Sequence, residues 1–210
     1  MATFIDSIKG MKVIITGGSK GIGKGCAKVF CEAGADVVIC SRNVNDCEIT
    51  AREIMQTSSG RCEYIKCDVS NEDEVKQLIE YAVKIYGRLD CLINNAGYYP
   101  PQRLIDDIPV EEFRYILNTN LVGYFAGCKY ALPYLRTTRG NIINMGSIIG
   151  AVGQEGASIY TATKGAISSL TKTLAMDEAR NGVRVNAVLP GNIITEMYYT
   201  NKSRDPDPEG

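Results

Sequence analysis

Three side chains in the second half of the sequence could together move a proton on and off an oxygen atom. Tyr160 and Lys164 are four residues apart, so on a helix they lie one turn from each other on the same face. Ser147 follows the apolar run 141–145, and the glycine-containing loop after it can return its hydroxyl to Tyr160. A tyrosine has an ordinary pKa of about 10, and a nearby ammonium lowers that pKa by favouring the phenolate.

A tyrosine and a lysine at this spacing are also common by chance, so the pair alone does not identify a catalytic site. The interpretation depends on the elements that would position them. Residues 12–16 form an apolar, β-branched run that predicts a buried strand, and the glycine-rich stretch 16–23 follows it and opens a helix. A strand, a glycine turn and a helix in this order are typical of a dinucleotide site, where the pyrophosphate lies on the helix N-terminus.

The glycines of this turn have separate expected roles. Gly17 allows the tight turn, Gly21 lets the backbone approach the pyrophosphate, and Gly23 lets helix and strand pack closely. The order Gly-x-x-x-Gly-x-Gly differs from the Gly-x-Gly-x-x-Gly fingerprint, and the stretch is not a P-loop. A plain glycine-rich turn is the alternative, and the position between strand and helix argues against it. The predicted cofactor contacts here are Gly17, Ser19, Lys20, Gly21, Ile22 and Gly23.

The end of the second predicted strand, 36–40, bears on which cofactor binds. An acid at this place binds the free 2′-hydroxyl of NAD(H), whereas an arginine accommodates the 2′-phosphate of NADP(H). The chain has Ser41 and Arg42 there and no acid, and Lys20 would add a second cation on the same side. NADP(H) is therefore favoured and NAD(H) stays possible. The alternative for Arg42 is an ordinary solvated surface arginine.

The whole pattern predicts an α/β fold, a doubly wound parallel sheet of the Rossmann-like kind. Apolar runs that predict strands alternate with segments of helical spacing, and such alternation implies βαβ units with helices on both faces of the sheet. The helical pattern over 110–135 is interrupted around 118–120. We interpret residues 1–200 as one domain and 201–210 as a disordered tail. The predicted strands are 12–16, 36–40, 62–67, 91–93, 141–145 and 183–189.

Composition excludes several classes of protein and site. The chain has no histidine, which excludes a Ser-His-Asp triad and a histidine-containing zinc site, and we predict no metal. The net charge of −1 gives no reason to expect nucleic acid, and no apolar run is long enough to cross a membrane. The first apolar run continues into the glycine turn, so we interpret it as a strand rather than a signal peptide. The eight cysteines include no C-x-x-C pair and are predicted to be reduced thiols of a cytoplasmic protein.

Together these motifs resemble the short-chain dehydrogenase/reductase family. They occur in the family's order and cover nearly all of the chain to about residue 195. Some phrases, among them RLDCLINNAG and PGNIIT, are similar to those of a hydroxysteroid dehydrogenase within the family. The matching elements are TGGSKGIG at 16–23, DV at 68–69, NNAG at 94–97, Asn120 in NTNLVG, Ser147, Tyr160 with Lys164, and PG at 190–191.

The resemblance implies a role for each matching residue. Tyr160 would be the acid/base, Lys164 would bind the nicotinamide ribose and lower the pKa of Tyr160, and Ser147 would orient the substrate oxygen. Asn120 would hold a water in a proton relay from Lys164. The other implied cofactor contacts are Asp68 and Val69 beside the adenine, Asn94, Ala96 and Gly97 near the adenosine ribose, and Pro190, Gly191, Ile193 and Thr195 at the nicotinamide carboxamide.

Some of these residues have purely structural alternatives. Asp68 could cap the end of a strand, Asn94 could be a turn residue, and Asn120 could satisfy a helix kink. The substrate pocket is expected to be lined by tyrosines that suit a flat apolar ligand, although they could equally be loop packing. The residues expected to line it are Tyr98, Tyr99, Gln154 and Tyr198.

The implied activity is hydride transfer between the nicotinamide cofactor and a secondary alcohol or ketone, with a hydroxysteroid as one candidate substrate. The family resemblance also implies a homodimer or homotetramer, assembled through the helices after 110 and 159. Compared with the family pattern, a C-terminal strand and a substrate-covering segment are missing, so strand 183–189 would become a sheet edge. Two alternatives stay open: a catalytically inactive dinucleotide-binding or interaction form, and an epimerase-type relative with different glycine spacing.

Overall fold

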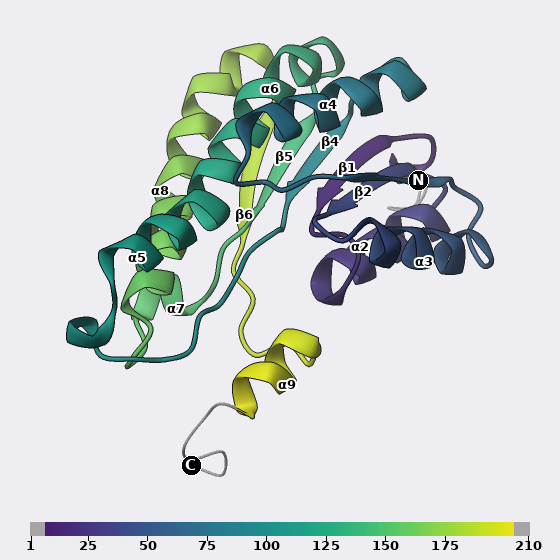
Figure 1. The fold of residues 1–210 in the computed structure, drawn as a ribbon. Coiled ribbons are helices and arrows are strands. Elements are labelled where there is room, and N and C mark those ends of the chain that lie inside the picture. The colour runs from purple at the N-terminus through teal and green to yellow at the C-terminus, as the bar shows by residue number, and fades with distance from the viewer. Residues whose placement is uncertain (1–6, 204–210) are drawn as a thin grey trace.

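The computed structural model describes residues 7–203, which contain a six-stranded parallel sheet flanked by helices (Figure 1). The spatial order of the strands is β3-β2-β1-β4-β5-β6, which confirms the predicted doubly wound sheet. The winding reverses between β1 and β4, and in such sheets ligands bind outside the carboxyl ends of the strands at this point. The strands are β1 Lys12–Thr16, β2 Asp36–Ser41, β3 Cys62–Lys66, β4 Cys91–Asn94, β5 Asn141–Met145 and β6 Arg184–Val188.

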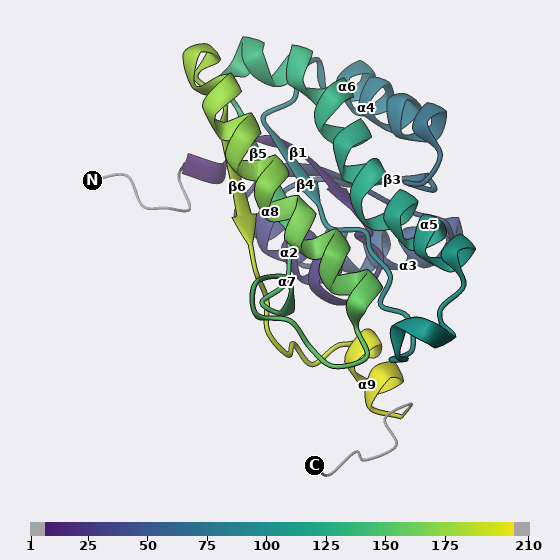
Figure 2. The ribbon, with the colours of Figure 1, turned by 90° about the vertical axis from the view of Figure 1, so that its left-hand side faces the viewer.

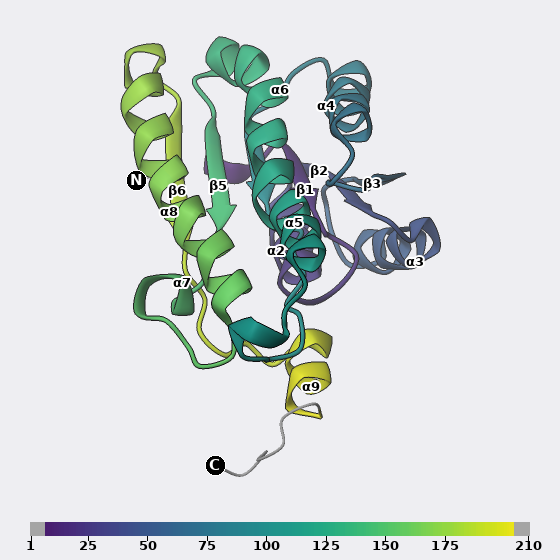
Figure 3. The same cartoon turned by 60° about the vertical axis from the view of Figure 1, so that its left-hand side comes forward.

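Helices cover the two faces of the sheet unequally. On one face lie α4, α6 and α8, and on the other lie α2 and α3 (Figures 2 and 3). The helices are α2 Gly21–Glu32, α3 Val44–Met55, α4 Glu72–Tyr86, α5 Val110–Leu117, α6 Gly123–Thr138, α7 Ile149–Val152, α8 Ser158–Glu178 and α9 Glu196–Lys202. Short 3₁₀ turns occur at Ile105–Asp107 and Ala179–Asn181.

The strand residues build two separate cores because successive side chains of a strand point to opposite faces. In β1, Ile14 packs in the core beneath α4 and α6, whereas Val13 and Ile15 pack against α2 and α3. All three are almost completely buried. A central strand that is apolar on both sides must be covered on both sides, which explains the unbroken apolar runs of the sequence.

Strand β6 departs from the expectation of a sheet covered on both faces. It pairs only with β5 and is an edge of the sheet in the described part of the chain. Val185 points into the core, while Arg184, Asn186 and Val188 are exposed. The exposed residues alternate with the buried one, so it is the face opposite α8 that is uncovered.

Two segments differ from a regular α-helix or from the irregular loop that the sequence predicts. The break expected around 118–120 is a π-helix, Asn118–Val122, which joins α5 to α6. The loop expected after Ser147 contains the short helix α7 instead of being irregular throughout. At the other end of the chain, α9 reaches Lys202, and most of the tail predicted to be disordered lies outside the described residues.

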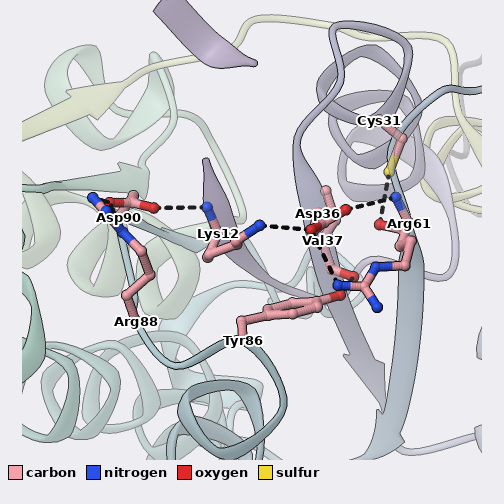
Figure 4. Close-up of polar contacts among 8 residues, drawn as sticks. All are labelled: Lys12, Cys31, Asp36, Val37, Arg61, Tyr86, Arg88 and Asp90. Carbon is pink, nitrogen blue, oxygen red and sulfur yellow. Dashed lines mark hydrogen bonds and ion pairs between the residues drawn. The ribbon is translucent and has the colours of Figure 1, made fainter. Parts of the chain in front are cut away.

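A polar network at the amino ends of the strands ties β1 to its neighbours (Figure 4). Asp36 accepts hydrogen bonds from the Lys12 ammonium at 2.7 Å and from the backbone N–H of Arg61 at 3.0 Å. The Tyr86 ring lies 5.6 Å from the Lys12 Nζ and 5.5 Å from the Arg61 guanidinium carbon, which is within cation–π range. Asp90 accepts the backbone N–H of Lys12 at 2.9 Å. Each carboxylate of this network therefore has cationic or backbone partners.

Candidate active site

A cavity of about 620 Å³ opens at the carboxyl ends of the strands. Segments far apart in the sequence line it: the glycine turn after β1, the loop after β4, the residues after β5, one face of α8, and the chain after β6. The structure thus brings the predicted cofactor turn and most of the predicted catalytic side chains into one cavity. The predicted site residues in its lining are Gly17, Lys20, Gly21, Ile22, Ala96, Gly97, Ser147, Tyr160, Lys164, Pro190, Gly191, Ile193 and Thr195.

The glycine turn has a backbone that other residues would not adopt or fit. Gly21 has φ +53°, in the left-handed region that favours glycine. A Cβ at Gly23 would lie 2.3 Å from the carbonyl oxygen of Gly17, so the expected close packing of helix on strand is present. Lys20 precedes α2 without a side-chain cap, and no acidic residue lies in the first turn. The first amides of α2 at the cavity therefore suit a phosphate.

Asn95 joins this turn to the end of β4 through hydrogen bonds, although it was not among the site residues predicted from the sequence. Its side-chain amide donates to the carbonyl oxygens of Thr16 at 2.9 Å and Gly17 at 3.1 Å. Its backbone N–H donates to the Thr16 hydroxyl at 2.9 Å. Its position inside NNAG, between the predicted site residues Asn94 and Ala96, is the signal by which the sequence could have identified it.

Ser147 and Tyr160 meet because α7 packs directly against α8. A Cβ at Gly150 would lie 2.8 Å from the carbonyl carbon of Lys164, so only a glycine lets the two helices come this close. Burial raises the pKa of Tyr160 to about 12, and a hydrogen bond with the Ser147 side chain opposes that rise. The structure therefore does not show the expected lowering of the Tyr160 pKa.

Lys164 explains why the lowering is missing. Its Nζ donates to the carbonyl oxygen of Met145 at 2.7 Å and to the Tyr124 hydroxyl at 3.5 Å. The centroid of the Tyr160 ring is 5.7 Å from this nitrogen. Burial lowers the pKa of Lys164 to about 7, because the charged form loses its hydration. A lysine that titrates near neutrality is a weaker source of positive charge than the fully charged ammonium assumed from the sequence.

Asn120 lies in the π-helix, completely buried, and holds the loop after β4. Its side-chain oxygen accepts the backbone N–H of Tyr98 at 2.8 Å, and its amide nitrogen donates to the Tyr98 carbonyl at 3.0 Å. The same nitrogen lies 3.3 Å from the Thr163 hydroxyl, one residue before Lys164. The side chain therefore connects the π-helix, the loop and α8, and it does not line the cavity.

Several other predicted cofactor contacts also lie outside the cavity lining. Asp68 accepts hydrogen bonds from the N–H of Ser70 at 2.9 Å and from its hydroxyl at 2.7 Å, as a cap at a strand end would. Asn94 is buried and donates to Asn144 on β5 at 2.9 Å. The predicted residues outside the lining are Ser19, Gly23, Ser41, Arg42, Asp68, Val69, Asn94 and Asn120.

The predicted 2′-phosphate cations have different partners. The Arg42 guanidinium donates to the Tyr115 hydroxyl of α5 at 2.8 Å, so its charge has a neutral partner. The Lys20 ammonium forms an ion pair with Asp46 of α3 at 2.8 Å. The hydrogen bond and charge of Asp46 raise the pKa of Lys20, and Glu196 adds to this effect. Arg42 is thus the cation of the two without an acidic partner among the described residues.

The opposite end of the cavity contains aromatic and amide side chains. The rings of Tyr99 and Tyr160 are 4.6 Å apart at an interplanar angle of 59°. Tyr99, Gln154 and Tyr198 line the cavity as predicted, together with Gln102, which donates to the Tyr99 hydroxyl at 2.9 Å. Tyr98 was also expected here but is not part of the lining, and Asn120 binds its backbone N–H and carbonyl.

The family model described as short chain dehydrogenase matches residues 11–206, nearly the whole chain. The chain belongs to the short-chain dehydrogenase family. Members of this family act on CH–OH groups with NAD or NADP, so the chain is an oxidoreductase. The predicted family is thereby confirmed from an independent comparison.

Similar short-chain dehydrogenases include sugar and polyol enzymes. L-fucose dehydrogenase of Bos taurus is 44% identical over 199 residues, which are 95% of this chain and 72% of the relative. The structure of levodione reductase has a TM-score of 0.91 at 28% identity, covering 96% of this chain and 80% of the other. NAD⁺-bound xylitol dehydrogenase has a TM-score of 0.84 at 30% identity, covering 88% and 71%. None of these three is named as a hydroxysteroid dehydrogenase.

The described residues contain neither a candidate metal site nor a candidate membrane span. Across residues 7–203, no three histidine, cysteine or carboxylate side chains are grouped so that they could hold a metal ion. Within the same residues, no helix is long and apolar enough to cross a membrane.

Proposed function

We propose that the chain transfers a hydride between NADP(H) and a secondary alcohol or ketone, with Tyr160 as the acid/base. Ser147 would donate a hydrogen bond to the substrate oxygen and hold it next to the Tyr160 hydroxyl. Lys164 would bind the nicotinamide ribose and supply positive charge to the phenolate. The observation that carries this proposal is the shared cavity, which joins the glycine turn to these three side chains.

The residues present fit a nicotinamide dinucleotide. The uncapped start of α2, the left-handed Gly21 and the close packing at Gly23 form a turn suited to a pyrophosphate. Gly17, Lys20, Gly21 and Ile22 would hold the pyrophosphate, and the chain after β6 would lie over the nicotinamide. When bound, the nicotinamide supplies the hydride chemistry, and the protein supplies geometry and proton transfer.

The proton would move along a short path. In alcohol oxidation the phenolate of Tyr160 accepts the hydroxyl proton, and in ketone reduction the phenol donates it back. Ser147 contacts Tyr160 and can therefore contact the same oxygen. Because burial keeps the pKa of Tyr160 near 12, the tyrosine is a ready proton donor at neutral pH and needs nearby positive charge to act as a base.

The preference for NADP(H) rests on the charges near the end of β2. Arg42 follows Ser41 at this place, and its partner, the Tyr115 hydroxyl, is neutral. The Ser41 hydroxyl donates to the Asn43 carbonyl at 2.8 Å. The sequence Cys40-Ser41-Arg42 has no acidic residue that could accept a hydrogen bond from a free ribose 2′-hydroxyl. The Lys20–Asp46 pair reduces the second positive charge, and we therefore assign the preference mainly to Arg42.

A direct test is titration of the purified chain into NADPH, and separately into NADH, following the fluorescence of the cofactor. We expect saturable binding of both, with NADPH saturating at a lower protein concentration. Arg42→Ala should remove that difference, while Arg52→Ala on α3, whose partner is Glu48 of the same helix, serves as the matched control. Tighter binding of NADH by the unaltered chain would contradict the preference and leave the rest of the function in place.

The substrate is proposed to be a polyol or sugar hydroxyl. Gln102, Gln154 and Ser147 offer hydrogen bonds to several hydroxyl groups, and Tyr99 offers an aromatic wall. L-fucose dehydrogenase and xylitol dehydrogenase, both similar to this chain, support this class. A hydroxysteroid is the second candidate, because the same tyrosines suit a flat apolar ring system. Cofactor reduction measured with L-fucose, xylitol and a 17β-hydroxysteroid separates the two classes.

An inactive, partner-binding form is the second candidate function, favoured by the uncovered face of β6.

A homodimer is proposed for either case, since an apolar groove formed by Leu121, Val122, Phe125, Ala166 and Leu170 lies between the π-helix, α6 and α8. Light scattering on the purified chain, together with the turnover assay, tests both. A dimer that binds cofactor without turnover on any substrate supports the inactive form.

A cytoplasmic location is proposed from the thiols. All eight cysteines are free, and seven of them are buried. Reduced thiols in this number are typical of a reducing compartment. Microscopy of the tagged chain and its fractionation with cytoplasmic markers would test the location.

A further inference from the structure

Lys164 lies in a cage formed mainly by two tyrosines and one carbonyl group. The lysine is almost completely buried, and its Nζ lies 5.2 Å from the Tyr124 ring centroid and 5.7 Å from that of Tyr160. Its hydrogen bonds go to the carbonyl of Met145 and to the Tyr124 hydroxyl. An ammonium has three N–H donors and therefore depends strongly on each acceptor in such a dry place.

Tyr124 contacts the lysine with both its ring and its hydroxyl. It is 1% exposed and lies in the first turn of α6, directly after the π-helix. Its hydroxyl donates to the Met145 carbonyl at 3.3 Å and accepts from the Lys164 Nζ at 3.5 Å. Tyrosine and lysine therefore share the carbonyl that ends β5, two residues before Ser147. Tyr124 was not among the site residues predicted from the sequence.

We propose that Tyr124 is a positioning residue, which holds the Lys164 Nζ at the cavity wall through its hydroxyl and the face of its ring. This inference rests on the proposed function for its effect on catalysis, whereas the contact itself does not depend on which reaction the protein performs. Tyr124 gives the lysine a second acceptor and a cation–π partner on the side away from the cavity. The lysine is thereby directed toward Tyr160 and the position assigned to the nicotinamide ribose.

Every element packed around the lysine is consistent with this role. The titratable groups that face it are Tyr124 from α6 and Tyr160 from α8. Cys128, also on α6, contributes to the raised pKa of Tyr124. From the loop after β4, a Cβ at Gly97 would lie 3.6 Å from the Nζ, and this loop contributes no charge there. The hydrogen bonds of the Lys164 ammonium go to the Met145 carbonyl and the Tyr124 hydroxyl, and the Tyr124 ring lies within cation–π range, so these groups support its positive charge against the effect of burial.

The first test measures Lys164 itself and needs no substrate. In protein labelled with ¹³C at the lysine Cε, the Lys164 signal, assigned with Lys164→Met, should titrate near pH 7. In Tyr124→Phe, which keeps the ring, we expect the midpoint to fall by about one pH unit because the ammonium loses an acceptor. Tyr134→Phe on the same helix is the matched control and should leave the midpoint unchanged. An unchanged midpoint in a folded Tyr124→Phe protein would overturn the proposal.

The second test is a double-mutant cycle on NADPH binding. Tyr124→Phe alone should weaken NADPH binding about threefold to tenfold, and it should have no further effect in a Lys164→Met background. Equal effects in both backgrounds would show a structural role separate from Lys164 and contradict the proposal. Tyr124→Leu, which also removes the ring, should lower the Lys164 midpoint further than Tyr124→Phe, and an equal shift would contradict the part assigned to the ring. If the unaltered chain binds no cofactor, the proposed function fails, and the NMR titration still decides the role of Tyr124.

Discussion

The two ends of the sheet treat buried polar groups in opposite ways. At the amino end, Asp36 has Lys12 and Arg61 as partners, and Asp90 accepts from Lys12 and Arg88 (Figure 4). At the carboxyl end, the cavity contains a lysine with no acidic partner and a tyrosine whose phenolate is disfavoured by burial. The polar groups at the amino end therefore hold the strands together. Those at the carboxyl end can still form hydrogen bonds and charge interactions with a bound molecule.

This difference appears in the direction of the pKa shifts. Burial by itself raises the pKa of Asp36, but the hydrogen bonds from Lys12 and Arg61 bring it below its ordinary value. Burial lowers the pKa of Lys164 to about 7, and no counter-charge reverses that shift. A group stabilised in its charged form contributes to folding, whereas a group held away from its preferred state is available for chemistry.

The largest effect is expected from Tyr160→Phe at the carboxyl end. Removal of the proton donor should lower turnover about a thousandfold, since general acid–base catalysis contributes factors of this size. NADPH affinity and thermal stability should change little, because the ring stays in place. Steady-state rates and cofactor titration measure this, with Tyr134→Phe as the control. Substantial activity in Tyr160→Phe would contradict the role of Tyr160 as the acid/base. It would also remove the proposed chemical difference between the amino and carboxyl ends of the sheet.

The second prediction concerns pH. With the pKa of Tyr160 raised to about 12, the phenolate fraction increases about tenfold per pH unit below that value. Alcohol oxidation should therefore accelerate from pH 7 to pH 9, but by less than tenfold per pH unit, because Lys164 has a pKa of about 7 and loses its charge over the same range. Ketone reduction, which uses the phenol, should stay nearly constant. Rates in both directions across this range test the assignment. A falling oxidation rate would contradict Tyr160 as the base.

The third prediction concerns the amino end. Asp36→Asn should reduce the free energy of unfolding by about 1–2 kcal/mol, because Lys12 and Arg61 lose a charged acceptor. The contribution should disappear as the pH falls through the lowered pKa of Asp36, where the native carboxylate itself is protonated. Denaturant unfolding at pH 7 and pH 3 measures it. Glu32→Gln, from an exposed pair with Lys28, is the control and should have a smaller effect.

The smallest effect is expected from the Lys20–Asp46 pair near the glycine turn. Asp46→Asn frees the Lys20 charge and should tighten NADPH binding about threefold, with NADH binding nearly unchanged. Glu53→Gln, whose partner Lys24 lies on α2, is the matched control on the same helix and should change neither affinity. Equal gains for the two cofactors would show that Asp46 acts on something other than the 2′-phosphate.

The sheet could be predicted from the sequence because its signals are local. The runs at 12–16 and 141–145 are apolar and β-branched, and the structure has strands at those bounds. The convergence of Ser147 and Tyr160 was also predictable in outline, because the glycine-containing loop after Ser147 can return its hydroxyl to Tyr160. Interactions between distant segments were not: the hydrogen bonds of Asn95 to Thr16 connect residues 79 apart.

The pKa of Lys164 shows more clearly that interactions between distant segments could not be predicted from the sequence. Its presence one turn from Tyr160 could be read from the sequence, whereas its pKa depends on how completely the fold removes water around it. The Met145 carbonyl and the Tyr124 ring reach it from β5 and α6, and neither is close in sequence. Likewise, Asn94 sits in a motif that suggested a cofactor contact, but its amide donates to Asn144 within the sheet.

The π-helix Asn118–Val122 makes the site depend on the number of residues as well as on their identity. A π-turn is equivalent to an α-helix with one residue inserted, and each residue turns a helix by about 100°. Deleting Thr119 would restore an ordinary helix and would rotate Asn120 and Tyr124 by about 100° relative to α5. We expect such a shortened chain to keep its helix content by circular dichroism and to lose NADPH affinity. The placement of both side chains therefore depends on the one extra residue of the π-helix.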